Sequence, residues 1–208
     1  MVHYKCDDES YQELLEYIRR ELREPFPLLI GTDGDKAIQS AIDQVFPSSI
    51  HRYCTRHVKQ YIERQLVMSG IALDDRHLLL ERIFAFSESV IQAESDNQFH
   101  DRLLDLQKLW ISIKNNQMNR HRNINDFFLW FERYQKDKLR CHLIAAVRVQ
   151  VSYVDRNGTP MLFYNNDVEA LNHGFKSEAN WEIQSLSQTI NILHRHILSQ
   201  QNESIRAL

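Results

Sequence analysis

The sequence predicts an α/β fold interrupted by a large all-helical insertion. Short apolar runs alternate with segments of helical periodicity over residues 1–66, whereas residues 67–151 show helical periodicity and no convincing strand. The 208 residues include five glycines and four prolines, below the average usage of about 7% and about 5%. So few turn-forming residues argue against an all-β fold, and a composition that is 43% hydrophobic and 25% charged excludes a largely disordered chain.

The chain opens with a short strand and an amphipathic helix. Residues 2–6 alternate polar and apolar side chains, which is typical of a strand. Ser10 and Glu13 have the spacing of a capping box, so we expect the helix to begin there. Pro25 and Pro27 are expected to end it, because proline cannot donate a helical hydrogen bond.

Two further strand and helix pairs follow. Residues 28–30 predict a buried strand, with residues 31–34 as its exit, and apolar spacing predicts a helix over residues 35–45. The Phe-Pro-Ser-Ser turn then leads to a strand at residues 50–54 and a helix at residues 57–66. This β-α-β-α-β-α order predicts parallel strands.

The insertion reads as a series of helices. We expect one long helix over residues 74–91, a second over 99–113, a third over 124–139 and a short one over 142–151. Residues 152–208 are predicted to return to the core as a loop and two helices, which gives three regions: 1–66, 67–151 and 152–208. Five aromatic residues at helical spacing are expected in the core rather than in a base-stacking surface: Trp110, Phe127, Phe128, Trp130 and Phe131.

The charge distribution is more informative than the net charge of −3. Residues 106–148 hold nine lysines and arginines against three acidic residues, a candidate footprint for nucleic acid. The basic side chains that we single out are Arg120, Arg122, Lys136 and Lys138; a solvated helical face is the alternative. Three widely spaced cysteines, no apolar run of about 18 residues and no signal-peptide layout predict an intracellular protein without a membrane span.

Two acidic residues are candidates to carry chemistry. Asp33 follows a predicted parallel strand, at the sheet edge where ligands collect, and its carboxylate can hold a divalent cation. Asp33 or Asp35 could instead cap the next helix, and Asp35 is the better placed for that role. Glu169 lies in the first turn of a predicted helix, where it could simply complement the helix dipole.

Cys54 and His57 form a CxxH at a strand-to-helix junction. A thiolate and an imidazole at this spacing can share a Zn²⁺ ion, which needs four ligands in a structural site. Cys141 and His142 could complete such a site, with His51, His77, His100 and His121 as further options. A buried cysteine beside a hydrogen-bonded histidine is the competing interpretation.

Together these pieces resemble the Mutator-like element (MULE) transposase domain. The segment GTDGDKAIQSAIDQVFPSSIHRYCTRHVKQYI (residues 31–62) is similar to the family's TDG-type strand, helix, FP turn and CxxH. The segment FYNNDVEALNHGFKSEANW (residues 163–181) resembles its final block, with an asparagine-rich lead and V-E-x-x-N. The helical stretch between them is similar to the family's insertion.

The resemblance implies an RNase H-like fold that cuts and joins DNA at transposon ends in the nucleus. Its chemistry would use three carboxylates, D-D-E, holding two Mg²⁺ or Mn²⁺ ions. By motif, Asp33 corresponds to the second aspartate and Glu169 to the glutamate, while Cys54 and His57 correspond to the C/H pair. Homo-oligomer formation is a further expectation.

One part of the family's pattern is missing. The first aspartate belongs to a strand upstream of this sequence, so we expect an incomplete fold without its first strands; Asp7 and Asp8 come too late and are expected in a solvated turn. The chain alone is therefore expected to be inactive, as a fragment or as a remnant. The alternative is a transposon-derived module that binds nucleic acid or protein without catalysis. A phosphoenzyme with Asp33 at a sheet edge is a third alternative, but the sequence lacks a glycine-rich phosphate loop.

Overall fold

A computed structural model describes residues 7–22, 28–85, 87–118 and 126–165, together with six isolated residues between 173 and 195. The chain divides into two compact units, Cys6–Tyr164 and a second unit made of Met1–Lys5 and Asn165–Leu208. Only the first unit is described in detail below. The predicted strand at residues 2–6, both prolines of residues 25–27, and Glu169 lie outside the described residues.

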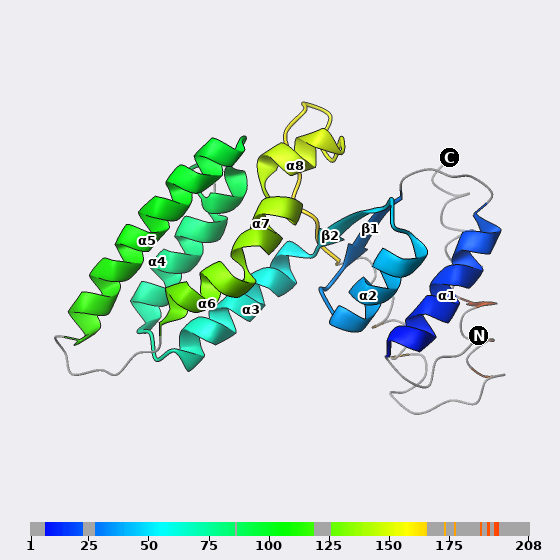
Figure 1. The fold of residues 1–208 in the computed structure, drawn as a ribbon, viewed down its shortest axis with the longest axis horizontal. Helices are drawn as coiled ribbons and strands as arrows, with labels where there is room; N and C mark the ends of the chain where they lie inside the picture. The colour runs from blue at the N-terminus through cyan, green and yellow to red at the C-terminus, as the bar shows by residue number, and fades with distance from the viewer. Residues whose placement is uncertain are drawn as a thin grey trace. The chain divides into compact units, whose positions relative to one another are not determined.

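The described part is mostly helical and contains a small two-stranded sheet (Figure 1). Its elements, in chain order, are α1 (Asp8–Glu21), β1 (Leu29–Thr32), α2 (Lys36–Val45), β2 (Ile50–Tyr53), α3 (Thr55–Met68), α4 (Leu73–Phe84), the 3₁₀ helix η1 (Val90–Gln92), α5 (Asp96–Met118), α6 (Phe127–Tyr134), α7 (Lys136–His142) and α8 (Ala145–Gln150). None of the described helices is long and apolar enough to cross a membrane.

Helix α1 begins earlier than the sequence predicted. Asp7 is its N-cap, and the Asp7 carboxylate accepts a hydrogen bond from the backbone N of Ser10 at 3.0 Å. The capping-box prediction at Ser10 was therefore wrong, as was the placement of Asp7 and Asp8 in a loop. Aspartate is as good a cap as serine, so both starts were compatible with the local pattern.

The two strands pair in parallel, as their order predicted. Ile30 lies opposite His51 and Thr32 opposite Tyr53. The expectation that residues 28–30 form a buried strand was wrong in part, because Leu29 of β1 is 44% exposed. Gly31 on β1 is closely covered: a Cβ atom there would overlap the ring of Phe163.

Two predicted long helices are each broken in the structure. The helix expected over residues 74–91 ends at Phe84, and the chain turns through Ser87, whose φ is 67°, before η1. The helix expected over residues 124–139 is interrupted at Gln135, which separates α6 from α7. Apolar residues continue at helical spacing across both breaks, so periodicity alone did not reveal them.

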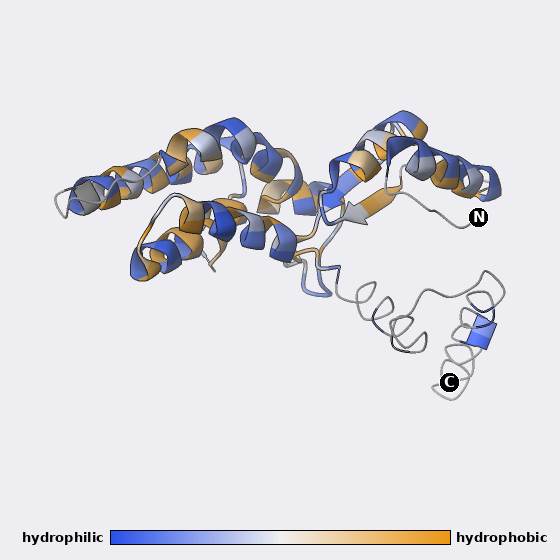
Figure 2. Cartoon of the chain, turned by 90° about the horizontal axis from the view of Figure 1, so that it is seen from below, coloured by the Kyte–Doolittle hydropathy of each residue, from blue (hydrophilic) through white to orange (hydrophobic). Residues whose placement is uncertain are grey.

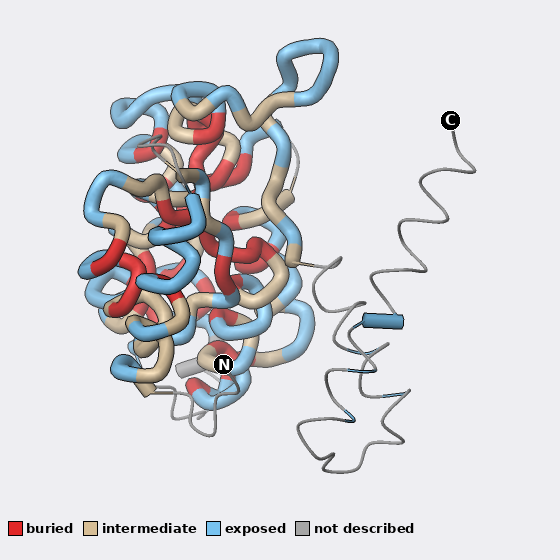
Figure 3. The backbone as a smooth tube through the Cα atoms, turned by 90° about the vertical axis from the view of Figure 1, so that its right-hand side faces the viewer, coloured by how far each residue is buried: buried red, intermediate tan, exposed pale blue. Residues whose placement is uncertain are grey.

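The buried side chains form two hydrophobic clusters. The smaller one joins α1 and α2 through Leu15, Ala41, Ile42 and Val45. The larger one runs from Tyr53 of β2 through α3 to α7. Hydrophobic and hydrophilic residues alternate along the helices in Figure 2, and buried stretches recur along the chain in Figure 3. The helical region therefore packs onto the end of the sheet through β2 and α3 rather than as a separate core.

Two buried arginines link this core to the chain around it. Arg52 of β2 donates hydrogen bonds to the carbonyl oxygens of His142 and Val147, at 2.7 and 2.6 Å. Arg148 of α8 donates to the carbonyls of Pro160 and Ile91 and to the side chain of Gln92, at 2.8, 2.9 and 2.8 Å. The hydrogen bonds of Arg52 thus link β2 to α7 and α8, and those of Arg148 link α8 to η1 and to the 153–161 loop.

Candidate functional site

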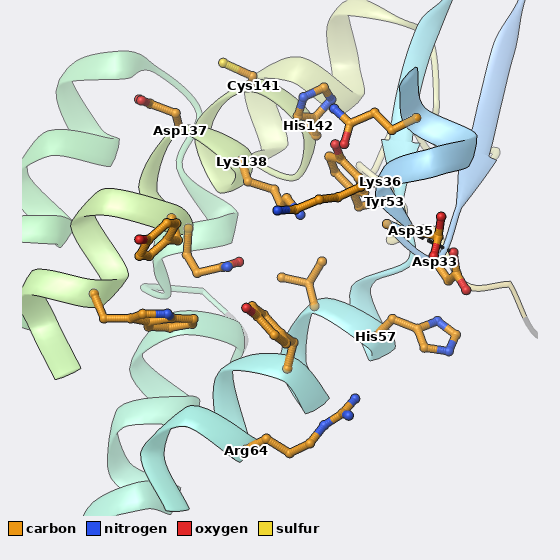
Figure 4. A pocket seen from close by; sticks show the side chains of 17 residues that line it. Asp33, Asp35, Lys36, Tyr53, His57, Arg64, Asp137, Lys138, Cys141 and His142 are labelled. Carbon is orange, nitrogen blue, oxygen red and sulfur yellow. Dashed lines mark hydrogen bonds between the residues drawn. The ribbon is translucent and has the colours of Figure 1, made fainter. Parts of the chain in front are cut away.

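A cleft of about 840 Å³ opens at the carboxyl end of the two strands. The end of β1, the start of α2, β2 and α3 form one side, and α6 and α7 form the other (Figure 4). Its lining mixes charged, aromatic and amide side chains: Asp33, Asp35, Lys36, Gln39, Tyr53, His57, Tyr61, Arg64, Trp130, Tyr134, Gln135, Asp137, Lys138, Cys141 and His142, together with Gly34 and Val58. This is the position at which ligands collect in α/β sheets.

Asp33 and Asp35 have different roles in the loop after β1. The Asp35 carboxylate caps α2, accepting hydrogen bonds from the backbone N atoms of Ala37 and Ile38 at 2.8 and 3.4 Å. The Asp33 carboxylate is exposed and, within the described ranges, accepts one hydrogen bond, from the backbone N of Asp35 at 3.2 Å. The interpretation that Asp35 is the cap is confirmed, which leaves most of the acceptor capacity of Asp33 facing the cleft.

Two histidines connect the strand ends to α7. Nε2 of His51 lies 2.7 Å from Oγ1 of Thr32, and the same hydroxyl accepts a hydrogen bond from the backbone N of Gly34. Nδ1–H of His142 donates to the carbonyl of His51 at 2.8 Å. This bond sets the tautomer of His142 and leaves Nε2 as the ring atom that can accept a hydrogen bond.

Burial keeps both imidazoles neutral near pH 7. Desolvation, with a smaller contribution from His142, lowers the pKa of His51 to about 4. Desolvation also lowers the pKa of His142, against the raising effect of its hydrogen bond to His51. The positive charges that line the cleft therefore include the lysine and arginine side chains Lys36, Arg64 and Lys138, which stand beside three aspartates.

Lys36 and Lys138 approach each other across the cleft (Figure 4). The Nζ atom of Lys138 lies 4.4 Å from the centroid of the Tyr53 ring. Desolvation and then the charge of Lys36 lower the pKa of Lys138. The repulsion that Lys36 exerts on Lys138 favours an anionic ligand between the two ammonium groups.

Trp130, Tyr61 and Tyr134 form an aromatic wall in the cleft. The Trp130 ring centroid lies 5.6 Å from that of Tyr61 and 6.3 Å from that of Tyr134. The sequence placed Trp130 in the core with four other aromatic residues, and Trp110, Phe127, Phe128 and Phe131 are indeed buried. Trp130 differs, because it packs against the core on one side and lines the cleft on the other.

The cysteine and histidine candidates are only partly gathered. Cys54 is fully buried at the start of α3, whereas His57, Cys141 and His142 line the cleft. No group of three or more histidine, cysteine or acidic side chains with metal-binding geometry occurs within the described ranges. A zinc site at Cys54 and His57 stays a prediction.

The predicted nucleic-acid contacts fall into two sets. Lys136 and Lys138 begin α7, and Lys138 lines the cleft, while Arg120 and Arg122 lie outside the described residues. Sequence reasoning did not single out Lys36, Arg64, Tyr61 or Gln135. Lys36 begins α2 just after β1, and this position at the sheet edge was the one available signal; Arg64 lies further along α3 and carried none.

Comparison with known proteins bears on the first part of the chain. The sequence model of the MULE transposase domain family matches residues 4–61, which include β1, α2, β2 and the start of α3. No curated protein and no solved structure gives a significant match. The matched segment carries Asp33, Cys54 and His57, and over residues 4–61 the chain is similar to the MULE transposase domain.

Proposed function

We propose that the chain is the core of a MULE-type DDE transposase, with an RNase H-like fold, whose reaction is the cleavage and transfer of DNA strands with the help of divalent metal ions. Without the first aspartate, this chain alone is expected to be inactive. Asp33 and Glu169 are the two carboxylates of the proposed site. The protein would act in the nucleus on transposon ends. The homo-oligomer expected from the resemblance belongs to the same proposal.

The position of Asp33 carries this proposal. It follows the carboxyl end of a parallel strand, within the segment that the family model matches, and its carboxylate faces a cleft of about 840 Å³. Asp35, two residues on, already satisfies the N-terminus of α2. A structural role as helix cap therefore does not account for Asp33.

The donor type of Asp33 fits Mg²⁺ or Mn²⁺. Its exposed carboxylate accepts one hydrogen bond among the described residues and keeps oxygen lone pairs for a hard cation. Asp33 and Glu169 are the residues that would hold the ion. When bound, such an ion supplies Lewis-acid activation of the attacking oxygen and stabilises the leaving oxygen.

Other cleft residues suit a DNA strand. Lys36, Arg64 and Lys138 carry charges that offset those of phosphates. The neutral ring of His142 is held by its bond to the carbonyl of His51 and can accept a hydrogen bond through Nε2. These side chains would position a phosphodiester beside Asp33.

The test is Mn²⁺-dependent nicking of duplex DNA ends by a chain extended upstream to include the first aspartate, and by the Asp33→Asn and Glu169→Gln variants of that extended chain. Both substitutions are expected to remove the nicking and to weaken Mn²⁺ binding, measured by the paramagnetic resonance signal of the free ion. Asp137→Asn is the matched control, because it removes a carboxylate from the same cleft but not from the strand end. Nicking that survives in the Asp33 and Glu169 variants would refute the catalytic proposal.

A second candidate is a module that binds nucleic acid without cutting it. The aromatic side chains and the three lysine and arginine side chains in the cleft favour it, since their contacts with a nucleic acid do not depend on a metal. It predicts DNA affinity that falls steeply with salt, because neutralised phosphates release counterions. Charge reversal at Arg120, Arg122, Lys136 and Lys138 should abolish binding; equal affinity at low and high salt would exclude this candidate.

A further inference from the structure

Gln135 is a buried polar residue whose hydrogen bonding is incomplete. It sits at the break between α6 and α7, is 1% exposed, and lines the cleft. Its backbone is fully used: its N donates to Phe131 and its carbonyl accepts from Leu139, both at 2.8 Å. Its side-chain Oε1 has no hydrogen-bond partner among the described residues. Buried amide oxygens are nearly always paired, so Oε1 of Gln135 has room for one N–H or O–H donor, from water or from a ligand in the cleft.

The surroundings of Gln135 narrow the chemistry of this ligand. Next to it, the aromatic wall of Trp130, Tyr61 and Tyr134 offers ring surface, and both tyrosines are exposed. Lys138, three residues further on, and Lys36 supply two cations held close together. A flat group with N–H donors, linked to an anion, satisfies all three features, and a nucleotide is such a group.

We propose that the cleft holds one unstacked nucleobase of a DNA strand. The base stacks on the aromatic wall and donates a hydrogen bond to Oε1 of Gln135, and its neighbouring phosphate lies between Lys36 and Lys138. This rests on the proposed function in so far as DNA is the ligand. Because Asp33 lines the same cleft, a base held there would fix the strand beside the proposed catalytic carboxylate.

The experiment compares a short labelled DNA single strand with the same strand carrying abasic sites in its centre. Fluorescence anisotropy at one salt concentration gives both affinities. Stacking makes us expect the intact strand to bind at least about tenfold more tightly. A free mononucleotide and the matching RNA strand are measured alongside.

Two variants test the assignment of residues. Gln135→Met keeps the volume of the side chain and removes its polar group, and Tyr61→Leu removes one exposed ring. Each should reduce the preference for the intact strand to about threefold or less. Lys36→Gln should weaken the binding of both strands by the same factor. Leu129→Ala is the control on α6, because Leu129 is 65% exposed and lies outside the cleft lining.

Thermal unfolding separates this role from a structural one. Because Gln135→Met removes an unsatisfied buried acceptor, the variant should unfold at the same temperature as the unaltered protein or at a higher one. Its preference for the intact strand over the abasic strand should be lost. A lowered midpoint together with an unchanged preference would overturn the assignment of Gln135.

The outcomes also separate this inference from the proposed function. Equal binding of intact and abasic strands would overturn base insertion and leave DNA binding standing. No binding of any DNA would overturn both. Tighter binding of RNA, or of the free nucleotide, with the same loss in Gln135→Met would assign the cleft to that ligand instead of DNA.

Discussion

The Nζ atom of Lys138 lies 4.4 Å from the centre of the Tyr53 ring, so a cation from α7 covers an aromatic side chain at the end of β2. This contact joins the insertion to the sheet at the edge of the cleft. It holds the charge of Lys138 near that of Lys36 in a half-buried position. The repulsion between the two ammonium groups is unfavourable, and an anion bound between them would reduce it.

Replacing Lys138 by Met should therefore weaken DNA binding with little loss of stability. We expect the slope of log affinity against log salt to fall by about 1, because one phosphate contact is removed. Titrations at several salt concentrations measure this slope. Lys108→Met is the control, since Lys108 is highly exposed on α5 and paired with Asp105 at 2.9 Å. Equal slopes for the two variants would contradict the assignment.

The buried His51 predicts a loss of stability in mild acid. Its pKa is about 4 in the folded protein, mainly through desolvation, against 6.5 for an exposed histidine. Between pH 6.5 and 4 the unfolded chain therefore binds more protons than the folded protein. The contribution of His51 to the free energy of unfolding is complete above pH 6.5 and is lost below it, by up to roughly 3 kcal/mol.

Urea unfolding across this pH range should be less steeply pH-dependent in His51→Gln than in the unaltered protein. The pKa of His142 is lowered too, so part of the dependence should remain. His77→Gln, at an exposed position on α4, serves for comparison. An unchanged profile in His51→Gln would rule out His51 as the source.

Gly31 should not tolerate a larger side chain. A Cβ atom at this position would overlap the ring of Phe163, so Gly31→Ala should destabilise the protein by about 1–3 kcal/mol. Denaturant titration measures the loss. Adding Phe163→Leu should recover part of it, and additive effects of the two substitutions would show that this contact is not the cause.

Substitutions of Asp33 and Asp35 should have different effects on the free energy of unfolding. Asp35→Ala removes both side-chain bonds of the α2 cap and should cost about 0.5–2 kcal/mol. Asp33→Ala should change the free energy of unfolding by less than about 0.5 kcal/mol. A large destabilisation by Asp33→Ala would mean that this aspartate is structural.

Arg148 should be needed for the packing of the 153–161 loop. Arg148→Met leaves the carbonyls of Pro160 and Ile91 without their donor and should cost about 2–3 kcal/mol. Proteolysis within the loop should speed up in parallel. Arg133→Met, at an exposed site on α6, should leave both measurements unchanged.

Much of the first part of the fold could be predicted from the sequence. The parallel order of β1 and β2, the helix between them and the cap at Asp35 each follow from local signals: an apolar run, helical spacing, and an aspartate just before an amphipathic helix. The breaks at Ser87 and Gln135 did not follow, because apolar residues keep their helical spacing across both.

The sequence by itself determined the chemistry at the strand end, since Asp33, the helix after it and the CxxH are contiguous along the chain. Only the tertiary structure decided what faces that end. Trp130, Gln135 and Lys138 reach it from about 100 residues away, through the packing of α6 and α7 on α3 and β2. Helical spacing shows which face of a helix is apolar, but not which other element packs against that face. A residue at the border of the core, such as Trp130, therefore lines a cleft only where the neighbouring helices leave it uncovered.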